Sequence, residues 1–312
     1  MRTLPSCARI RCMAKTQSPP NAVDDDQDER YFQHIQRALA VCKNYRPKFG
    51  QGRKAGLTLD EFRTLYQGDP FYTWFGLDSP LLYAAHKAAG GMTSVYRQIG
   101  MGCERLFRHL LRDSLGLTAE QVEWSYLVPT PCGKPRKLSL DGRIPLSAIS
   151  NAKMANRVRT WLRDGANSMK VSKKVIATLE GPVFEVRQGY KSKDAKRQNA
   201  DVGNAANAYA NSYLPVVVLL SSQIDDDISE RYARAQWLIL RGSLVGSPLQ
   251  STYAFAREVL GYDLAGFFTR NAARIRTEVE TVIEALLSRR PNSQTNIWTT
   301  LPPETTGDKR RT

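Results

Sequence analysis

The segment between residues 183 and 209 changes its periodicity partway along, and it constrains the fold more than any other part of the chain. In its first part, Glu185 and Arg187 face one side while Phe184 and Val186 face the other, and this period of two predicts a β-strand. In its second part the polar residues recur every three or four positions, which predicts a helix. A strand carrying Glu-x-Arg that leads into a polar, basic helix suits a divalent metal and a phosphate. The alternative is an edge strand with a solvated charged face.

The overall charge favours a polyanionic partner, of which nucleic acid is the commonest. The 312 residues include 45 Lys and Arg against 30 Asp and Glu, which gives a net charge of +15. The five cysteines are scattered without zinc-ligand spacing, which is typical of a reduced cytoplasmic protein. No apolar run reaches 18 residues, and the basic N-terminus lacks the apolar stretch of a secretory signal, so we expect no membrane span. Met13 is an alternative start to Met1.

The first 125 residues are expected to be mostly helical. One helix is predicted to follow residue 28, and later ones begin at the capping residues Thr58, Ser79, Thr93 and Thr118. Two glycines at positions 100 and 102 lie inside the helix predicted from Thr93, and they indicate close approach of another backbone. Glu104 beside them is either a metal or DNA contact or an ordinary surface residue.

From residue 126 the pattern changes to strands alternating with helices. The predicted strands are bounded by turn residues and span 126–129, 136–143, 175–179, 183–190 and 214–222. The last of these is continuously apolar, which is typical of a strand covered on both faces. The predicted helices span 147–164, the segment after 194, 225–232, 251–260 and 263–289. Residues 236–240 are either a strand or a continuation of the preceding helix. Tyr and Trp residues occur at core spacing, so we expect no base-stacking surface.

Two carboxylates on neighbouring predicted strands carry the chemistry. Asp141 ends one strand, and Glu185 lies on another with Arg187 two residues later. Carboxylate oxygens hold Mg²⁺, which lowers the pKa of bound water and neutralises charge on a phosphate. A nearby cation stabilises the charge that develops on phosphorus. The set is therefore suited to phosphodiester hydrolysis.

This layout resembles the PD-(D/E)xK nucleases, and most closely the type II restriction endonucleases that recognise sites with a CCGG-like core. In the resemblance, Glu185-Val-Arg187 takes the catalytic strand, residues 191–197 take the DNA-reading element, and Asp201 is the acid on the following helix. Residues 214–218, Leu-Pro followed by three valines, take the next strand. Asp141 lies 46 residues before Arg187, about the separation found in that group. The similarity covers residues 140 to 222.

The resemblance implies an α/β fold with a restriction-endonuclease-like mixed β-sheet core flanked by helices, a large helical N-terminal region and C-terminal helices. The expected divisions are a disordered extension at 1–24, the helical region at 25–125, the nuclease core with C-terminal helices at 126–290, and a disordered tail at 291–312. It also implies Mg²⁺-dependent, sequence-specific cleavage of double-stranded DNA that leaves 5′-phosphates. A homodimer or higher oligomer is expected, because two active sites must meet the two strands of a palindrome.

The site residues fall into three overlapping groups. The expected catalytic residues are Asp141, Glu185, Arg187 and Lys191. The expected metal ligands are Asp141, Glu185, Asp201 and Glu104. The expected DNA contacts are Lys191, Lys193, Asp194, Lys196, Arg197, Gln198, Asn199, Lys153 and Arg157.

Three choices stay open on the sequence alone. Arg187 stands where the family has lysine and cannot give up a proton, so the lysine role belongs either to Arg187 or to Lys191. The upstream carboxylate is either Asp141 or Asp164. The function is either restriction, structure-selective cleavage in repair or transposition, or DNA binding without catalysis. Because the reading element is rich in lysine, the recognised DNA sequence does not follow from the resemblance.

Overall fold

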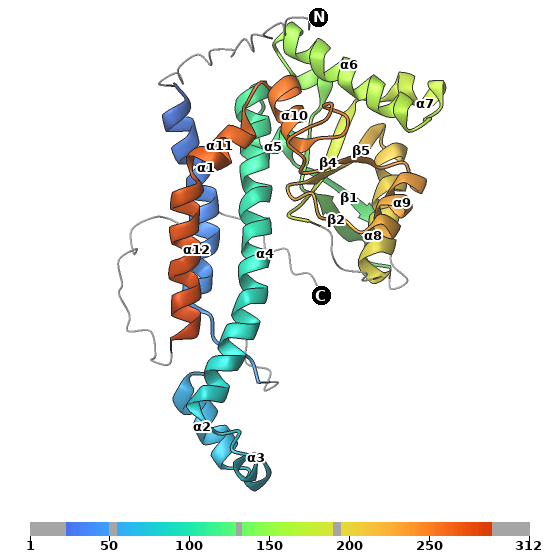
Figure 1. Ribbon diagram of the computed structural model, residues 1–312. Coiled ribbons are helices and arrows are strands. Elements are labelled where there is room, and N and C mark those ends of the chain that lie inside the picture. Colours follow the sequence, from blue (N-terminus) through green and yellow to red (C-terminus); the bar gives the residue numbers. More distant parts are fainter. Residues whose placement is uncertain (1–22, 50–54, 129–132, 190–194, 289–312) are drawn as a thin grey trace, which may run out of the picture.

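The protein is a mixed α/β chain in which helices flank a small sheet (Figure 1). The computed structural model describes residues 23–49, 55–128, 133–189 and 195–288. The predicted terminal extensions lie almost wholly outside these residues, as do Lys191, Lys193 and Asp194. No helix within the described ranges combines the length and the apolar character that a membrane span requires.

The central sheet has four strands in the order β3-β4-β5-β6, with β3 antiparallel to β4 and the others parallel. These strands are β3 (Gly142–Arg143), β4 (Gly181–Arg187), β5 (Tyr213–Leu219) and β6 (Leu238–Leu240). Ahead of them, β1 (Trp124–Val128) and β2 (Arg136–Leu140) form a separate antiparallel hairpin, which confirms the two strands expected there. Residues 238–240 are strand rather than helix.

Both faces of β4 and β5 are buried, which confirms the prediction for β5 from its apolar run and excludes the edge strand with a solvated charged face that was the alternative for β4. Val183 and Val217 pack on one face against α8 (Ala195–Ala210) and α9 (Asp226–Arg234). Phe184 and Val216 pack on the other face, within the larger core that includes α4 (Pro80–Leu115), α6 (Ala152–Ser168) and α10 (Thr252–Phe255). Because side chains alternate along a strand, Glu185 and Arg187 lie on the face with Val183, toward α8 and α9.

The strand expected at 175–179 is wrong. These residues belong mainly to the helix α7 (Lys173–Thr178), and β4 pairs with β3 and β5 instead. The hydroxyl of Ser172 accepts a hydrogen bond from the backbone N–H of Val175 and caps the helix. Val175 and Ile176 have high β-propensity, but they are only partly buried against the larger core. Local capping therefore outweighs that propensity.

The N-terminal region contains one long helix where two were expected. α4 runs unbroken for 36 residues, and Thr93 is inside it, with its hydroxyl donating to the carbonyl oxygen of Ala89. Gly102 lies where an added Cβ would come within 3.2 Å of the Cα of Ile35, so the close approach expected there is confirmed. At Gly100 no atom of the described residues would lie within 4 Å of an added Cβ, so the expected close approach is not seen there.

Three helices from opposite ends of the chain lie side by side (Figure 1). They are α1 (Val23–Ala40), α4 and α12 (Ala272–Leu287). The remaining helical elements are a 3₁₀ turn at Val41–Asn44, α2 (Leu59–Gln67), α3 (Pro70–Trp74), α5 (Ala119–Val122), a 3₁₀ turn at Leu146–Ala148, a π-helical turn at Ala256–Leu260 and α11 (Leu264–Arg270). The single helix expected at 263–289 is divided at Asn271, and the one expected from residue 147 begins at Ala152, where Asn151 caps it.

Candidate functional site

Glu185 and Arg187 are positioned by the buried strand β4. Only 2% of Glu185 is exposed, and the side chain of Arg187 is 13% exposed. They lie two residues apart, so both side chains project from the same face of the sheet. One terminal nitrogen of Arg187, Nη2, forms an ion pair with the carboxylate of Glu185. The predicted acid and cation are therefore in direct contact.

Asp201 joins this pair from the helix α8. Its Oδ1 lies 3.8 Å from Nη2 of Arg187, and the residue is buried. Burial alone would lower the pKa of the Arg187 guanidinium, but the carboxylates of Glu185, Asp141 and Asp201 together raise this pKa above its ordinary value. Arg187 is therefore a permanent cation among carboxylates.

Asp141 reaches the same cluster from the point where β2 ends and β3 begins. Its backbone N–H donates to the carbonyl oxygen of Phe184 over 2.8 Å, and its Oδ2 accepts a 2.8 Å bond from the backbone N–H of Val186. The side chain is thus fixed beside β4, one residue from Glu185. Arg108 of α4 donates to the carbonyl oxygen of Asp141 over 2.9 Å and holds this junction from the other side.

Two tyrosines complete the surroundings, and sequence reasoning missed both. Tyr232 of α9 donates its hydroxyl hydrogen to Oδ2 of Asp201. Tyr126 of β1 has a raised pKa, first because of burial and then because of the charges on Glu185 and Asp201. A pattern within one element does not reveal either contact, because each depends on how α9 and the hairpin pack against β4 and α8.

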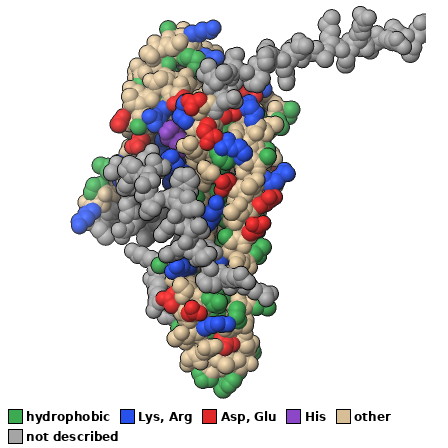
Figure 2. All heavy atoms as spheres, turned by 90° about the vertical axis from the view of Figure 1, so that its left-hand side faces the viewer, with side chains coloured by type: hydrophobic (Ala, Val, Ile, Leu, Met, Phe, Trp, Pro, Cys, Tyr) green, Lys and Arg blue, Asp and Glu red, His purple; other side chains and the backbone are tan. Residues whose placement is uncertain are grey.

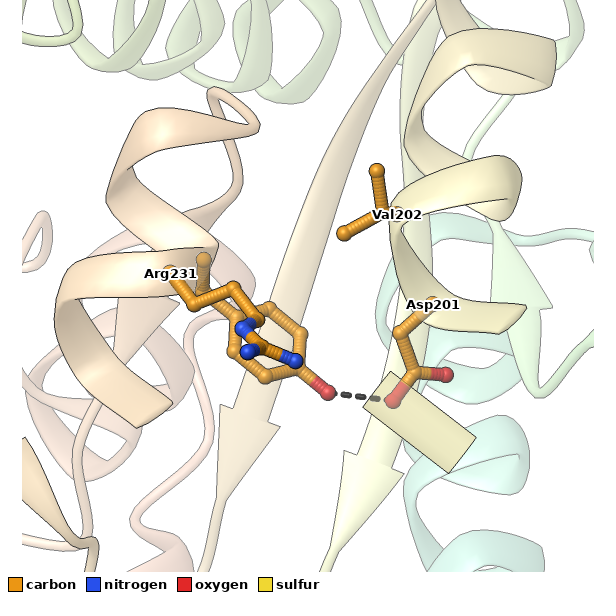
Figure 3. A pocket seen from close by; sticks show the side chains of 4 residues that line it. Asp201, Val202 and Arg231 are labelled. Carbon is orange, nitrogen blue, oxygen red and sulfur yellow. Dashed lines mark hydrogen bonds between the residues drawn. The ribbon is translucent and has the colours of Figure 1, made fainter. Parts of the chain in front are cut away.

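A small pocket, with no room for a water molecule, lies beside Asp201 (Figure 3). It is lined by Asp201 and Val202 from α8 and by Arg231 and Tyr232 from α9. The indole Nε1–H of Trp237, the residue before β6, donates to the backbone carbonyl of Asp201 over 3.1 Å and holds this turn of α8. Asp201 therefore has one carboxylate oxygen facing Arg187 and the other held by Tyr232.

The remaining predicted residues lie farther out. Glu104 pairs with Arg108 at 3.0 Å, so it is connected to Asp141 through one intervening side chain. Lys153 and Arg157 lie on α6, which packs on the opposite face of the sheet, and the structure does not bring them to the cluster. Asp164 is an exposed residue of the same helix. Lys196, Arg197, Gln198 and Asn199 lie on α8 ahead of Asp201, and their side chains are outside the described residues.

The donor set suits a hard divalent cation such as Mg²⁺. Asp141, Glu185 and Asp201 supply carboxylate oxygens, and with the single positive charge of Arg187 these four groups carry a formal charge of −2. Within the described ranges, no three His, Cys, Asp or Glu side chains are already arranged to hold a metal ion. Arg187 lies among the carboxylates, so a cation that bound Glu185 and Asp201 together would compete with the Arg187 ion pairs.

The choice between the two upstream carboxylates leads to a first prediction. If the chain is the nuclease that the resemblance implies, Asp141→Asn should lower DNA cleavage by at least about a hundredfold, because it removes one charge from the cluster beside Glu185. Asp164→Asn serves as the matched control, since it makes the same chemical change on an exposed face of α6, and we expect its rate to stay within about threefold of the parent. Initial rates of plasmid nicking in Mg²⁺ measure both. The reverse ranking would assign the upstream role to Asp164.

These observations define a mixed α/β protein with a buried acidic cluster around one arginine, at the face of the sheet covered by α8 and α9. Comparisons of the chain with models of known protein families, with curated proteins and with solved structures find no significant match.

Proposed function

We propose that this chain is a Mg²⁺-dependent endonuclease that cuts double-stranded DNA at a specific sequence and leaves 5′-phosphates. The observation that carries the proposal is the convergence of Asp141, Glu185, Arg187 and Asp201, which come from three separate elements, in one buried cluster. These residues were selected from the sequence because they suit phosphodiester hydrolysis, and their proximity in the fold supports that reaction. The succession β4, α8 and β5, which follows Asp141 after β3, α6 and α7, is the strand, helix and strand that the resemblance to PD-(D/E)xK nucleases implies around Glu185.

Each residue has a role that its surroundings permit. Asp141, Glu185 and Asp201 would hold Mg²⁺, which when bound supplies an activated water and charge neutralisation on the phosphate. Arg187 cannot act as a general base, because its pKa is held above the ordinary value. Its Nη2 contacts the carboxylate of Glu185 and lies 3.8 Å from Oδ1 of Asp201, beside the carboxylates that would hold the metal. Arg187 would therefore stabilise negative charge on the scissile phosphate.

A second candidate is a DNA-binding protein without catalysis. The observation that favours it is the pairing of Arg187 with both Glu185 and Asp201, which compensates part of the acidic charge without any metal. In that case the cluster would stabilise the fold and the basic chain would bind DNA. A nuclease that selects DNA structure rather than sequence is a variant of the first proposal, and the same experiment distinguishes it.

The deciding experiment is digestion of a large phage DNA and of a supercoiled plasmid with the full chain in Mg²⁺. Discrete bands from the phage DNA would support sequence-specific cleavage. Nicking of the plasmid without discrete bands would support a structure-selective nuclease. No cleavage with either substrate, combined with retained DNA binding, would contradict both nuclease proposals and support the non-catalytic one. EDTA provides the control for metal dependence.

A second prediction concerns salt. A protein of net charge +15 that contacts several phosphates releases counterions on binding. We expect the dissociation constant for a DNA duplex, measured by fluorescence anisotropy without Mg²⁺, to rise by at least about a hundredfold between 50 and 200 mM NaCl. A change smaller than about tenfold would contradict DNA as the partner.

A further inference from the structure

The head of the molecule projects from its body on the long helix α4. We define the head as residues 59–82, which comprise α2, α3 and the first turn of α4. Phe62 of the head packs with Leu57 and Tyr83, which flank the head, in a small apolar cluster that is separate from the larger cores. The end of α12 meets α4 at Lys87, whose Nζ donates to the carbonyl oxygen of Ala285 over 2.7 Å, and the head lies beyond this contact (Figure 1). At 1.5 Å per residue, the start of α4 is about 40 Å from Arg108 beside the acidic cluster.

Large apolar side chains are exposed on this head. Trp74 is 80% and Phe75 is 68% exposed, and Phe71, Tyr72 and Leu81 are exposed beside them. The rings of Phe71, Tyr72 and Phe75 contact one another, with centroids 5.8 Å apart for Phe71 and Tyr72 and 5.0 Å apart for Phe71 and Phe75, and Trp74 directly precedes Phe75 in the chain. Figure 2 shows hydrophobic side chains at the extreme tip of the molecule. The sequence expectation that the aromatic residues belong to the core is therefore wrong for this segment, and a contiguous exposed surface of this kind indicates a binding site.

The charge of the head differs in sign from that of the rest of the chain. Residues 59–82 contain four acidic side chains, one arginine and no lysine. The rest of the chain contains 44 Lys and Arg and 26 Asp and Glu. A head with this negative charge is repelled by DNA and attracted to a basic protein surface. The rest of the chain, which we call the body, carries a net positive charge.

We infer that the head docks onto the body of a second copy of this chain. The exposed aromatic surface supplies the apolar contact, and the opposite charges of head and body select this partner over a second head, since two acidic heads repel each other. In a two-fold symmetric dimer each head would contact the other body, so the contact would be made twice. This inference does not depend on the proposed nuclease function.

The test is the association state of the full chain by sedimentation velocity in 100 mM NaCl. We expect a dimer of twice the 35.0 kDa chain mass. The double variant Trp74→Ala/Phe75→Ala is expected to raise the dimer dissociation constant by at least about thirtyfold, the effect of losing an interface hot spot. Leu127→Ala, an exposed apolar residue of the hairpin, is the matched control and is expected to change the constant by less than about threefold. Circular dichroism checks that the variants fold.

A carbodiimide cross-link identifies the contact directly, because it joins a carboxylate to a lysine and the head has no lysine. In a mixture of ¹⁴N- and ¹⁵N-labelled chains, mixed-isotope links from head carboxylates such as Asp60 to body lysines would support the inference. A chain that stays monomeric at tens of micromolar would overturn it, as would a double variant that dimerises like the parent. Association that strengthens between 100 and 500 mM NaCl would instead indicate head-to-head docking and would also overturn it.

Discussion

Replacing Glu185 with glutamine is expected to lower the rate of DNA cleavage by about a hundredfold to a thousandfold while leaving DNA binding unchanged. The substitution keeps the size of the side chain but removes a charge that is 2% exposed and in contact with Arg187. The phosphate contacts that dominate affinity come from Lys and Arg, so the affinity for a duplex should not fall. Single-turnover cleavage and fluorescence anisotropy measure the two quantities separately.

Glu180→Gln is the matched control for this experiment. Glu180 precedes β4 directly but is exposed, so the same chemical change there should leave the rate within about threefold of the parent. If Glu185→Gln cleaves DNA as fast as the parent, Glu185 does not belong to an active site and the proposed mechanism fails. If both variants lose DNA binding together, the loss is a folding defect, which thermal unfolding would reveal.

The central strands and the acidic cluster could be predicted from the sequence because their signals are local. β5 is buried on both faces, and its continuous apolar residues report that burial directly. β4 was recognised as a strand from the alternation of Phe184 and Val186 with Glu185 and Arg187. The Glu-x-Arg spacing fixes a shared face, because the period of a strand is two. Asp201 was predicted through the resemblance, which implies an acid on the helix after this strand. Each of these signals lies within a single element or between elements that are adjacent in sequence.

The errors occurred where distant parts of the chain decide the outcome. α4 continues through Thr93 because α1 and α12 pack along it, and capping signals inside the helix cannot show that support. The contact between Tyr232 and Asp201 depends on the packing of α9 on α8. The exposure of Trp74 is the clearest case, because aromatic spacing indicates a core face but does not show whether any other element covers that face.

Replacing Arg187 with alanine is expected to lower the free energy of unfolding by about 3–5 kcal/mol in the absence of divalent ions. The substitution leaves Glu185 and Asp201 buried without the guanidinium that contacts both, and an uncompensated buried charge is costly. Arg234→Ala is the matched control, because Arg234 pairs with Glu230 at 2.6 Å on the exposed surface of α9. We expect it to cost less than about 1 kcal/mol. Chemical denaturation of both variants measures the difference.

Divalent ions should reverse part of this loss. Without Arg187 the cluster of Asp141, Glu185 and Asp201 changes from a formal charge of −2 to −3, so it attracts cations more strongly and no longer holds a competing one. A ligand that binds only the folded state stabilises it. Ca²⁺ should therefore raise the melting temperature of Arg187→Ala more than that of the parent, and calorimetry should show tighter Ca²⁺ binding. A variant with unchanged stability and unchanged Ca²⁺ binding would show that Arg187 does not compensate this cluster.

Cleavage by the same variant separates metal binding from catalysis. If Arg187 stabilises charge on the scissile phosphate, Arg187→Ala should cleave at least about a hundredfold more slowly even at saturating Mg²⁺, although it binds divalent ions more tightly. Lys191→Ala should instead weaken specific DNA binding by about 1–3 kcal/mol, as expected for a residue that contacts DNA away from the metal. The opposite pattern, with the rate lost in Lys191→Ala and only affinity lost in Arg187→Ala, would assign the lysine role to Lys191. Arg187 would then serve only as the internal counter-ion of Glu185 and Asp201.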